Sequence, residues 1–368
     1  MEPDAYAGII GAGVAGTALA NALTDLGKQI LLVDPLIGSE SVGMPAALVN
    51  PATGRRARMS WRSKECLSLL ENRLESVAQE TGRTDLWSQS GVLRPAVSED
   101  LAKNFRESVT SYNWPRGWIE WLEPGELRRR NAEVNSEFGG LWLSPAFTIF
   151  AGRYLQATHR LLASKGVETF PQETAWRYDS RSGCYELLLE GGQVRRVEHL
   201  VVAAGYRTST MADWEEILPL HPVKGQLVRY RTERLLKWNH AVSAMGYLLK
   251  TGEKEFLAGS TYEHRFSGLE TTRKALERIN EKVNVMLPGL KGNFYSVEQL
   301  SGARVTLPNR LPVIGSHPEK KRLYIFSALG SRGFLYSEYL ASLLAGHMIR
   351  GEAIPDIVGT NHDSRSTL

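Results

Sequence analysis

Three glycines near the amino terminus constrain the fold of this chain more than any other feature of its sequence. Gly11, Gly13 and Gly16 form a G-x-G-x-x-G pattern between a short apolar run, residues 5–10, and a segment rich in Ala and Leu, residues 14–26. The run predicts a buried strand and the segment predicts a helix. Glycines at these places allow a tight turn, a close approach of the backbone to a pyrophosphate, and close packing of helix against strand.

A second apolar run, residues 29–33, ends at Asp34. Strand, helix and strand within about 30 residues predict a βαβ unit with parallel strands. A carboxylate at the end of the second strand can accept hydrogen bonds from a ribose, so the arrangement predicts a bound dinucleotide. A glycine turn that only packs would leave Asp34 unexplained. The pattern fits NAD and FAD alike, but residues 41–54 form a loop of small residues after which the chain soon leaves α/β character, and this favours FAD.

The length of 368 residues exceeds the roughly 250–300 residues at which a single core stops growing. The predicted elements alternate between α/β and antiparallel segments, so two sequential domains do not describe the chain. We expect an α/β fold in which a Rossmann-like FAD-binding domain is interrupted by an α+β substrate domain with a mainly antiparallel sheet. The first domain would comprise residues 1–85, 150–215 and 296–368, and the second residues 86–149 and 216–295.

The composition excludes several other classes of protein. With 42% hydrophobic and 23% charged residues, the chain is neither disordered nor collagen-like. Its two cysteines, Cys66 and Cys184, are too few for a disulfide framework or a zinc knuckle, so we expect a reducing cytoplasm and no metal. The longest uncharged stretch, residues 5–24, lacks a basic flank and predicts neither a signal peptide nor a membrane span. The net charge of +4 identifies no polyanionic partner by itself.

Six short motifs, read in order along the chain, are similar to those of a known enzyme family. They lie at residues 9–16, 201–205, 222–226, 302–304, 311–315 and 329–334. Together they resemble the FAD-dependent amine oxidases of the D-amino-acid oxidase and glycine oxidase family, and the likeness runs from about residue 5 to residue 355. The resemblance implies non-covalent FAD and oxidation of a C–N bond by hydride transfer to the flavin. In such chemistry the protein positions its substrate rather than attacking it.

Within that family, four further segments look like the oxidase domain of the bifunctional enzyme that completes 5-methylaminomethyl-uridine at the tRNA wobble position. They are residues 246–249, 259–262, 327–333 and 351–355. The substrate that this implies is carboxymethylaminomethyl-uridine, a secondary amine with a glycine unit. Few residues precede the first strand, so we expect the methyltransferase half to be absent. Met44 and Ala47 replace residues that are usual in the flavin loop.

The resemblance also implies roles for individual residues. Arg304 would anchor the substrate carboxylate, since a guanidinium offers two parallel hydrogen bonds, and Tyr247 and Tyr262 would face the substrate. A structural ion pair and packed strand tyrosines are the alternatives, and Lys224 is expected to be solvated. The FAD-binding residues would be Gly11, Gly13, Val14, Ala15, Gly16, Asp34, Pro35, Gly43, Met44, Ala46, Ala47, Thr174, Ala203, Ala204, Gly205, Gly302, Arg304, Gly330, Ser331, Arg332 and Gly333. Residues 203–205 would line the ADP side, and the amides of Gly330, Ser331 and Gly333 would face the flavin carbonyl edge.

Two basic clusters are candidate contacts for RNA. Arg55, Arg56, Arg58 and Arg62 follow the predicted flavin loop, and residues 128–130 are all arginine and lie near tryptophans that could stack with bases. A solvated face is the alternative for each cluster. We therefore expect an FAD-dependent oxidoreductase acting on a glycine-like secondary amine, with tRNA as a candidate partner. The alternatives are an oxidase or dehydrogenase of free glycine, sarcosine or a D-amino acid, a nicotinamide dehydrogenase, and an FAD-holding protein without turnover.

Overall fold

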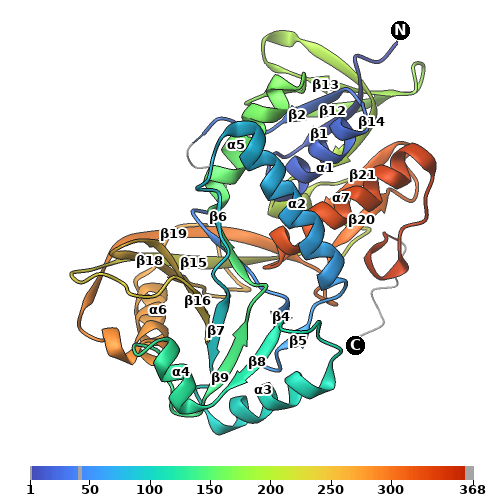
Figure 1. The fold of residues 1–368 in the computed structure, drawn as a ribbon. Helices are drawn as coiled ribbons and strands as arrows, with labels where there is room; N and C mark the ends of the chain where they lie inside the picture. Colours follow the sequence, from blue (N-terminus) through green and yellow to red (C-terminus); the bar gives the residue numbers. More distant parts are fainter. Residues whose placement is uncertain (1, 40–43, 361–368) are drawn as a thin grey trace.

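The computed structural model describes residues 2–39 and 44–360. In this part of the chain, two large sheets occupy the two ends of an elongated molecule (Figure 1). The first sheet has eight strands: β1 (Ala5–Ile10), β2 (Ile30–Val33), β11 (Glu168–Phe170), β12 (Ala175–Asp179), β13 (Cys184–Leu188), β14 (Val194–Val202), β20 (Val313–Ser316) and β21 (Leu323–Ser327).

The predicted βαβ unit lies at the centre of this first sheet. β1 pairs in parallel with β2 on one side and with β14 on the other, and β11 and β21 extend the parallel part. β12 and β13 form an antiparallel extension at the amino-terminal end of β14, and β20 pairs antiparallel with β21. The α/β fold expected from the glycine pattern is therefore confirmed.

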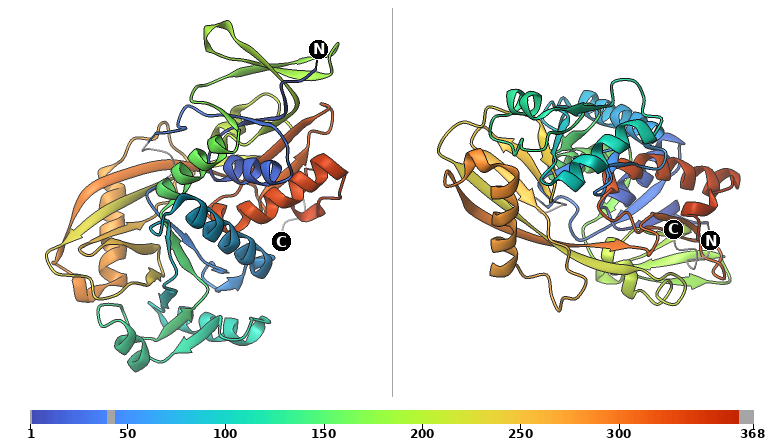
Figure 2. Two further views of the ribbon diagram at one scale, coloured as in Figure 1. Left: turned by 45° about the horizontal axis from the view of Figure 1, so that its top comes forward. Right: turned by 90° about the horizontal axis from the view of Figure 1, so that it is seen from below.

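Four helices gather on one face of this sheet (Figures 1 and 2). They are α1 (Val14–Asp25), α2 (Ser63–Thr81), α5 (Ala151–Ser164) and α7 (Gly333–Arg350). Local sequence explains their limits: α2 buries Leu67, Leu70 and Leu74 at helical spacing and ends at Gly82, whose φ of 68° lies in the left-handed region. The opposite face of the sheet is covered by a smaller core around Trp214.

The second sheet also has eight strands. They are β7 (Val92–Pro95), β8 (Ile119–Leu122), β9 (Gly140–Leu143), β15 (His221–Thr232), β16 (Ala241–Ser243), β17 (Tyr247–Gly252), β18 (Glu255–Gly259) and β19 (Phe294–Thr306). All neighbours are antiparallel except β16 and β7. The expected domain boundary at residue 296 falls inside β19, so the division into domains stays a prediction.

Helices cover both faces of the second sheet. α6 (Arg273–Met286), which begins after the capping hydroxyl of Thr272, buries Ile279 and Val283 against one face, and α3 (Glu99–Ser111) packs Phe105 against the other. The remaining elements are short: α4 (Pro124–Arg130), a three-stranded sheet of β3 (Ala47–Val49), β10 (Phe147–Ile149) and β6 (Trp87–Ser88), a hairpin of β4 (Ala52–Thr53) and β5 (Arg58–Met59), and the 3-10 helices η1 (Glu190–Gly192), η2 (Gly205–Thr210), η3 (Pro288–Leu290) and η4 (Asp356–Val358).

The long strands β15 and β19 connect the two halves of the molecule (Figure 2). They pair along their whole length, from His221 opposite Thr306 to Thr232 opposite Phe294. The carboxyl end of β19 reaches the first sheet, where the Gly330 amide donates a hydrogen bond to the Val305 carbonyl. This junction brings α7 and the β1–α1 turn close to the second sheet. No helix in the described part of the chain is both long and apolar enough to span a bilayer.

Candidate active site

The turn between β1 and α1 requires its three glycines for different reasons. A Cβ at Gly16 would lie 1.8 Å from the Gly11 carbonyl oxygen, and one at Gly11, where φ is 105°, would lie 2.4 Å from the carbonyl oxygen of Ala203. A Cβ at Gly13 would meet no protein atom within 4 Å. Gly11 and Gly16 are therefore needed for packing, whereas the space beside Gly13 is open to a ligand.

Asp34 has a structural role that sequence analysis did not foresee. Its Oδ2 accepts a hydrogen bond from the Ala12 amide and its Oδ1 one from the Leu36 amide, each at 2.8 Å. The carboxylate thus holds the glycine turn in place while it lines a cavity of about 310 Å³. Each oxygen keeps a second lone pair that can accept a hydrogen bond from a ligand.

Two adjoining cavities lie at the junction of the two sheets. The cavity that contains Asp34 shares Val14, Ala303, Arg304, Gly330 and Gly333 with a cavity of about 340 Å³. The predicted FAD-binding residues that line one or both are Gly13, Val14, Ala15, Asp34, Met44, Ala46, Ala47, Ala203, Ala204, Gly205, Gly302, Arg304, Gly330, Ser331, Arg332 and Gly333. The two cavities together form an elongated site from the β1–α1 turn to the second sheet.

Some predicted residues lie elsewhere. Pro35 is exposed and lines neither cavity, and the Thr174 hydroxyl lies 3.0 Å from the carbonyl oxygens of Ala175 and Leu188, away from both. Gly43 lies outside the described residues. Thr174 directly precedes β12, the edge strand at the opposite end of the first sheet from β11 and β2.

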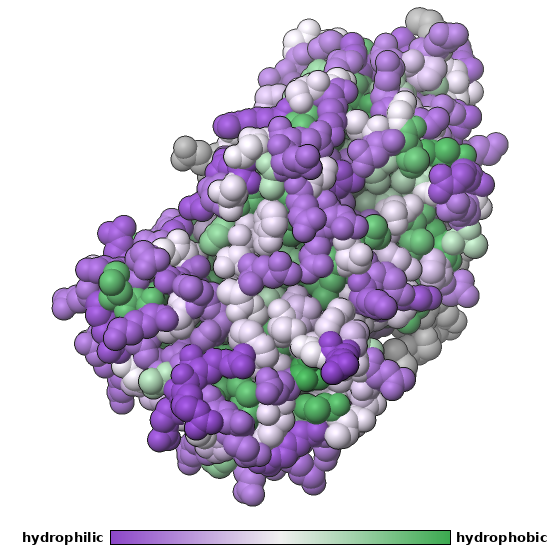
Figure 3. Space-filling view, viewed as in Figure 1, coloured by the Kyte–Doolittle hydropathy of each residue, from purple (hydrophilic) through white to green (hydrophobic). Residues whose placement is uncertain are grey.

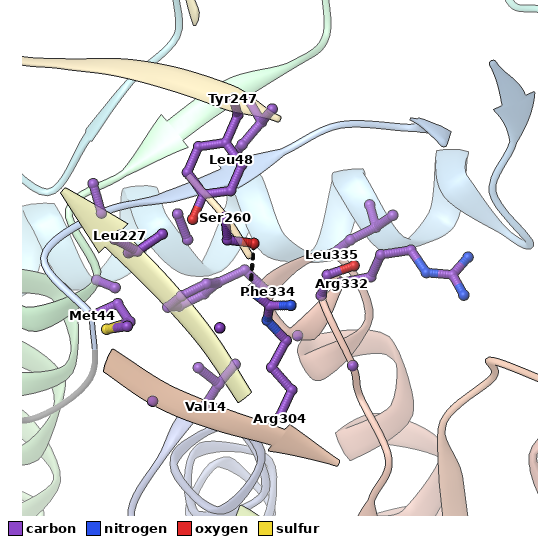
Figure 4. Close-up of a pocket in the computed structure, with 18 of the residues that line it drawn as sticks. Val14, Met44, Leu48, Leu227, Tyr247, Ser260, Arg304, Arg332, Phe334 and Leu335 are labelled. Atoms are coloured by element: carbon purple, nitrogen blue, oxygen red, sulfur yellow. Dashed lines mark hydrogen bonds between the residues drawn. The ribbon is translucent and has the colours of Figure 1, made fainter. Parts of the chain in front are cut away.

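Arg304 points into the larger cavity from β19 (Figure 4). Its Nη2 donates a hydrogen bond to the Ser260 hydroxyl at 2.6 Å, and its guanidinium lies 4.8 Å from the ring centroid of Tyr262. Its Nη1 is buried without a hydrogen-bond partner, and no carboxylate among the described residues forms an ion pair with it. A Cβ at Gly225 would lie 2.4 Å from Nη2, so the glycine leaves room for the guanidinium.

The two tyrosines differ in their surroundings. Tyr247 is partly buried and lines the larger cavity, with its hydroxyl on the Ser260 side (Figure 4). Burial raises its pKa to about 12, and the nearby Arg304 charge only partly opposes this shift. The phenol is therefore protonated at neutral pH and can donate a hydrogen bond. Tyr262 is 56% exposed and lies at the rim of the cavity.

Ser260 is a site residue that the sequence analysis did not single out. It follows β18, is 1% exposed, and lines the larger cavity. The Lys282 ammonium of α6 donates a hydrogen bond to its carbonyl at 2.8 Å, which fixes the backbone at this point. In the sequence, residues 259–262 carry only a family resemblance, and no local pattern identifies Ser260 as a site residue.

The expectation that Lys224 is solvated is wrong. Its side chain is 4% exposed, and its ammonium donates a hydrogen bond to the Glu270 carbonyl at 2.6 Å. β15 is covered here by the segment that leads into α6, and this tertiary contact buries the lysine. Lys224 lines neither cavity.

The turn before α7 presents fewer amides than expected. The Gly330 amide is already used, because it donates to the Val305 carbonyl at 3.1 Å. Among the described residues, no backbone carbonyl accepts a hydrogen bond from the amide of Ser331 or Gly333. Both residues line the larger cavity. Free amides at a helix amino terminus favour negative charge on a ligand.

The two basic clusters differ in their partners and position. Arg55, Arg56 and Arg58 are exposed in the β4–β5 hairpin, close to the cavity-lining residues Asn50 and Thr53, whereas Arg62 pairs with Glu65. The second cluster lies on α4, over which Figure 3 shows strongly hydrophilic residues. α4 lines neither cavity.

The tryptophans near α4 do not form free stacking surfaces. Trp114, Trp118 and Trp121 are partly buried, and the indole of Trp121 donates to Glu123 and lies 4.3 Å from the guanidinium of Arg106.

Cys66 and Cys184 are both buried and line neither cavity. Within residues 2–39 and 44–360, no group of three His, Cys, Asp or Glu side chains is placed to hold a metal ion.

Comparison with protein families gives one match that covers most of the chain. The model of the family DAO, described as FAD dependent oxidoreductase, matches residues 7–346. Among curated proteins, the tRNA 5-methylaminomethyl-2-thiouridine biosynthesis bifunctional protein MnmC of Thiobacillus denitrificans is 26% identical over 362 residues, which cover 95% of this chain and 57% of that protein. The protein of the same name from Leptospira borgpetersenii is 25% identical over 389 residues, which cover 94% of this chain and 57% of that protein. This chain thus spans a little over half the length of these relatives.

Solved structures share the fold at lower identity. Glycine oxidase from Geobacillus kaustophilus superposes with a TM-score of 0.82 at 20% identity, with 96% of each chain covered. Iminodiacetate oxidase from Chelativorans sp. BNC1 gives a TM-score of 0.76 at 22% identity, with 95% of this chain and 97% of that one covered.

Proposed function

Because this chain belongs to the DAO family of FAD-dependent oxidoreductases, we propose that it oxidises the C–N bond of a glycine-like secondary amine. The main support for the proposal is that the Arg304 guanidinium has no partner for one of its nitrogens. Its guanidinium faces the cavity with Nη1 buried and unpaired, and no described carboxylate compensates its charge. Arg304 is partly buried, and a buried guanidinium nitrogen without a partner is costly unless a ligand completes it. A ligand carboxylate would do so with two parallel hydrogen bonds.

The residues present fit FAD, the cofactor of this family. The two cavities adjoin and share five lining residues, and the open space at Gly13 lies where a pyrophosphate would approach. Gly13 and Asp34 would hold the dinucleotide end, and the free amides of Ser331 and Gly333 would lie at the other end. When bound, FAD supplies the two-electron acceptor for the reaction. We propose that it is held without a covalent bond, since both cysteines are buried away from the cavities.

The protein's own groups orient the substrate. Arg304 and the neutral phenol of Tyr247 can both donate to a carboxylate, so a glycine unit would be fixed through its acid group. Met44, Leu48 and Leu227 form an apolar wall of the same cavity (Figure 4). With a substrate bound, this wall would keep water from the amine and so strengthen the electrostatic contacts made there.

For the amine itself, we favour carboxymethylaminomethyl-uridine in tRNA, in the cytoplasm. The supporting observations are the name of the curated relatives and the exposed arginines beside the cavity. Free glycine, sarcosine or another small amino acid is the second candidate, favoured by the likeness in fold to glycine oxidase.

Anaerobic bleaching of the flavin absorption by defined substrates tests the proposal. We expect bleaching with tRNA that carries carboxymethylaminomethyl-uridine, and much slower bleaching with free glycine, sarcosine or D-alanine. Bleaching by the small amino acids alone would exclude tRNA as the substrate. Replacing the anchor, Arg304→Ala, should lower kcat/KM about 100-fold or more, since it removes hydrogen bonds to a charged group.

A further inference from the structure

The β4–β5 hairpin carries an uncompensated group of positive charges. Ala52 pairs with Met59 and Thr53 with Arg58, and the turn between them contains Arg55 and Arg56. Arg55, Arg56 and Arg58 are exposed, and none of their guanidinium groups forms an ion pair or a hydrogen bond with another described residue. Three guanidinium groups therefore lie within four positions of one turn and repel one another.

The hairpin is held from inside the protein by a fourth arginine. Arg94 on β7 is 4% exposed, and its Nη1 and Nη2 donate to the carbonyls of Ala52 and Gly54 at 3.0 and 2.7 Å. The Ser108 hydroxyl of α3 donates to the carbonyl of Ala57, the last residue of the turn, at 2.7 Å.

Arg94 has no carboxylate partner among the described residues, and its guanidinium lies 4.8 Å from the ring centroid of Phe105. Burial lowers its pKa to about 10, so it is still charged at neutral pH. Burying an unpaired cation is costly, and here the charge fixes the shape of one exposed turn. It also adds to the positive potential of the hairpin. Rigidity and unpaired positive charge together are the properties expected of a preformed site for an anion.

The position of the hairpin links it to the cavity. Asn50 and Thr53 line the cavity that contains Arg304, and Arg55 follows Thr53 by two residues. Two residues of extended chain span at most about 7 Å, so a ligand bound at the turn would lie next to the cavity lining.

The arginines of α4 contrast with this arrangement. The Arg130 guanidinium lies 4.3 Å from the ring centroid of Trp142, and its Nη2 lies 3.8 Å from Oε2 of Glu120. Nε of Arg128 donates a hydrogen bond to the Ser136 hydroxyl at 3.2 Å. Two of the three residues in that cluster therefore already have partners within the protein, and the cluster is the weaker candidate for an anionic ligand.

We propose that the β4–β5 hairpin, residues 52–59, binds the phosphate backbone of the RNA that carries the substrate amine. A guanidinium group can donate two parallel hydrogen bonds to the oxygens of one phosphate. An RNA backbone bound at the hairpin would place a neighbouring nucleotide at the cavity. The inference rests on the proposed function, because it assumes that the amine is part of RNA. It adds a second binding element, one that acts on the polymer and not on the reacting group.

The test uses the FAD-loaded full chain and bulk tRNA as the probe. We would compare the triple variant R55Q/R56Q/R58Q with the matched control R128Q/R129Q/R130Q, which removes the same charge from α4. Affinity for tRNA is measured by fluorescence anisotropy over a series of KCl concentrations. Flavin absorption and the thermal midpoint of each variant verify that the fold is retained.

In the hairpin variant we expect tRNA affinity to fall about tenfold or more, and the slope of log K against log salt to decrease by about 2 to 3, since each lost phosphate contact removes about 0.7–0.9 from it. In the α4 variant the slope should change by less than about 1. An unchanged slope in the hairpin variant, or an equal loss in both variants, would overturn the inference, and so would binding of anionic vesicles but not tRNA through the same arginines.

The two proposals fail in different ways. If the wild-type protein binds tRNA through the hairpin but modified tRNA does not bleach its flavin, the proposed reaction is wrong and the RNA site stands. If modified tRNA bleaches the flavin and the hairpin variant keeps its salt slope, the reaction stands and the site is elsewhere.

Discussion

Arg304 donates a hydrogen bond to Ser260 over 2.6 Å, although the two residues lie on different segments of the second sheet and are separated by 44 positions. The Ser260 hydroxyl accepts this bond, so its own proton remains available for another acceptor. The pair can thus present two donors to one carboxylate, Nη1 of Arg304 and the hydroxyl of Ser260.

Ser260→Ala should therefore weaken carboxylate binding about tenfold, because a hydrogen bond to a charged group contributes about 1.5 kcal/mol. Titrating the FAD-loaded protein with glycolate, followed by the flavin spectrum, measures this affinity. Ser260→Thr, which keeps the hydroxyl, should retain most of it. Equal affinities in wild type and Ser260→Ala would show that the hydroxyl neither contacts the carboxylate nor positions Arg304 for it.

Gly225→Ala should displace the Arg304 guanidinium, because the new methyl group would lie 2.4 Å from Nη2. We expect glycolate affinity to fall between about 10- and 100-fold while FAD is retained, since small misplacements of an anchor have effects of this size. Gly252→Ala is the matched control: it is also a strand glycine of this sheet, and its Cβ would meet only the Glu255 side chain at 3.4 Å. Full affinity in Gly225→Ala would exclude the steric argument.

Tyr247→Phe should lower glycolate affinity about tenfold at every pH between 6 and 9, since a hydrogen bond from the phenol to a charged carboxylate contributes about 1.5 kcal/mol. The pKa of Tyr247, raised to about 12 by burial, keeps the phenol protonated across this range. The wild-type profile should accordingly show no step from this group below pH 9. A variant whose deficit disappears toward pH 9 would indicate that the phenol ionises there.

Two glycines of the β1–α1 turn have different roles: Gly16 allows close packing, and Gly13 leaves space for a ligand. Gly13→Ala should fold normally, because φ is −72° and no protein atom lies within 4 Å of the new Cβ, but it should retain FAD about tenfold less tightly or worse. Gly16→Ala should instead lower the free energy of unfolding of the apoprotein by about 1–3 kcal/mol, because its Cβ would overlap the Gly11 carbonyl. Circular dichroism, urea denaturation and FAD titration measure these effects. Equal FAD affinity in Gly13→Ala and wild type would show that the cofactor does not approach this turn.

Glu338 of α7 should make stability depend on pH. Burial raises its pKa from 4.5 to about 7, although Arg73 at 3.3 Å opposes the shift. The native state therefore favours the protonated acid, and its contribution is full below pH 4.5 and lost as pH rises to about 7 and beyond. Relative to Glu338→Gln, the wild type should lose about 3 kcal/mol of unfolding free energy between pH 4.5 and pH 8. Urea denaturation of both proteins at several pH values measures the difference, and parallel curves would contradict the expectation.

Local sequence predicted the elements whose signals are local. The run at residues 5–10 became β1, and the segment at residues 14–26 that predicted a helix became α1. The ordered motifs also indicated the family, because each one reflects a backbone geometry that a short segment can specify.

By itself, then, the sequence determined the α/β frame, the glycine turn and the candidate anchor Arg304. Tertiary structure decided that Ser260 meets this anchor, that Asp34 holds the turn, that Lys224 is buried, and that one of two similar arginine clusters adjoins the cavity. These relationships depend on the register between β15, β18 and β19 and on which faces become covered. Register and burial are set by contacts between distant segments, and a short stretch of sequence carries no signal of its partner.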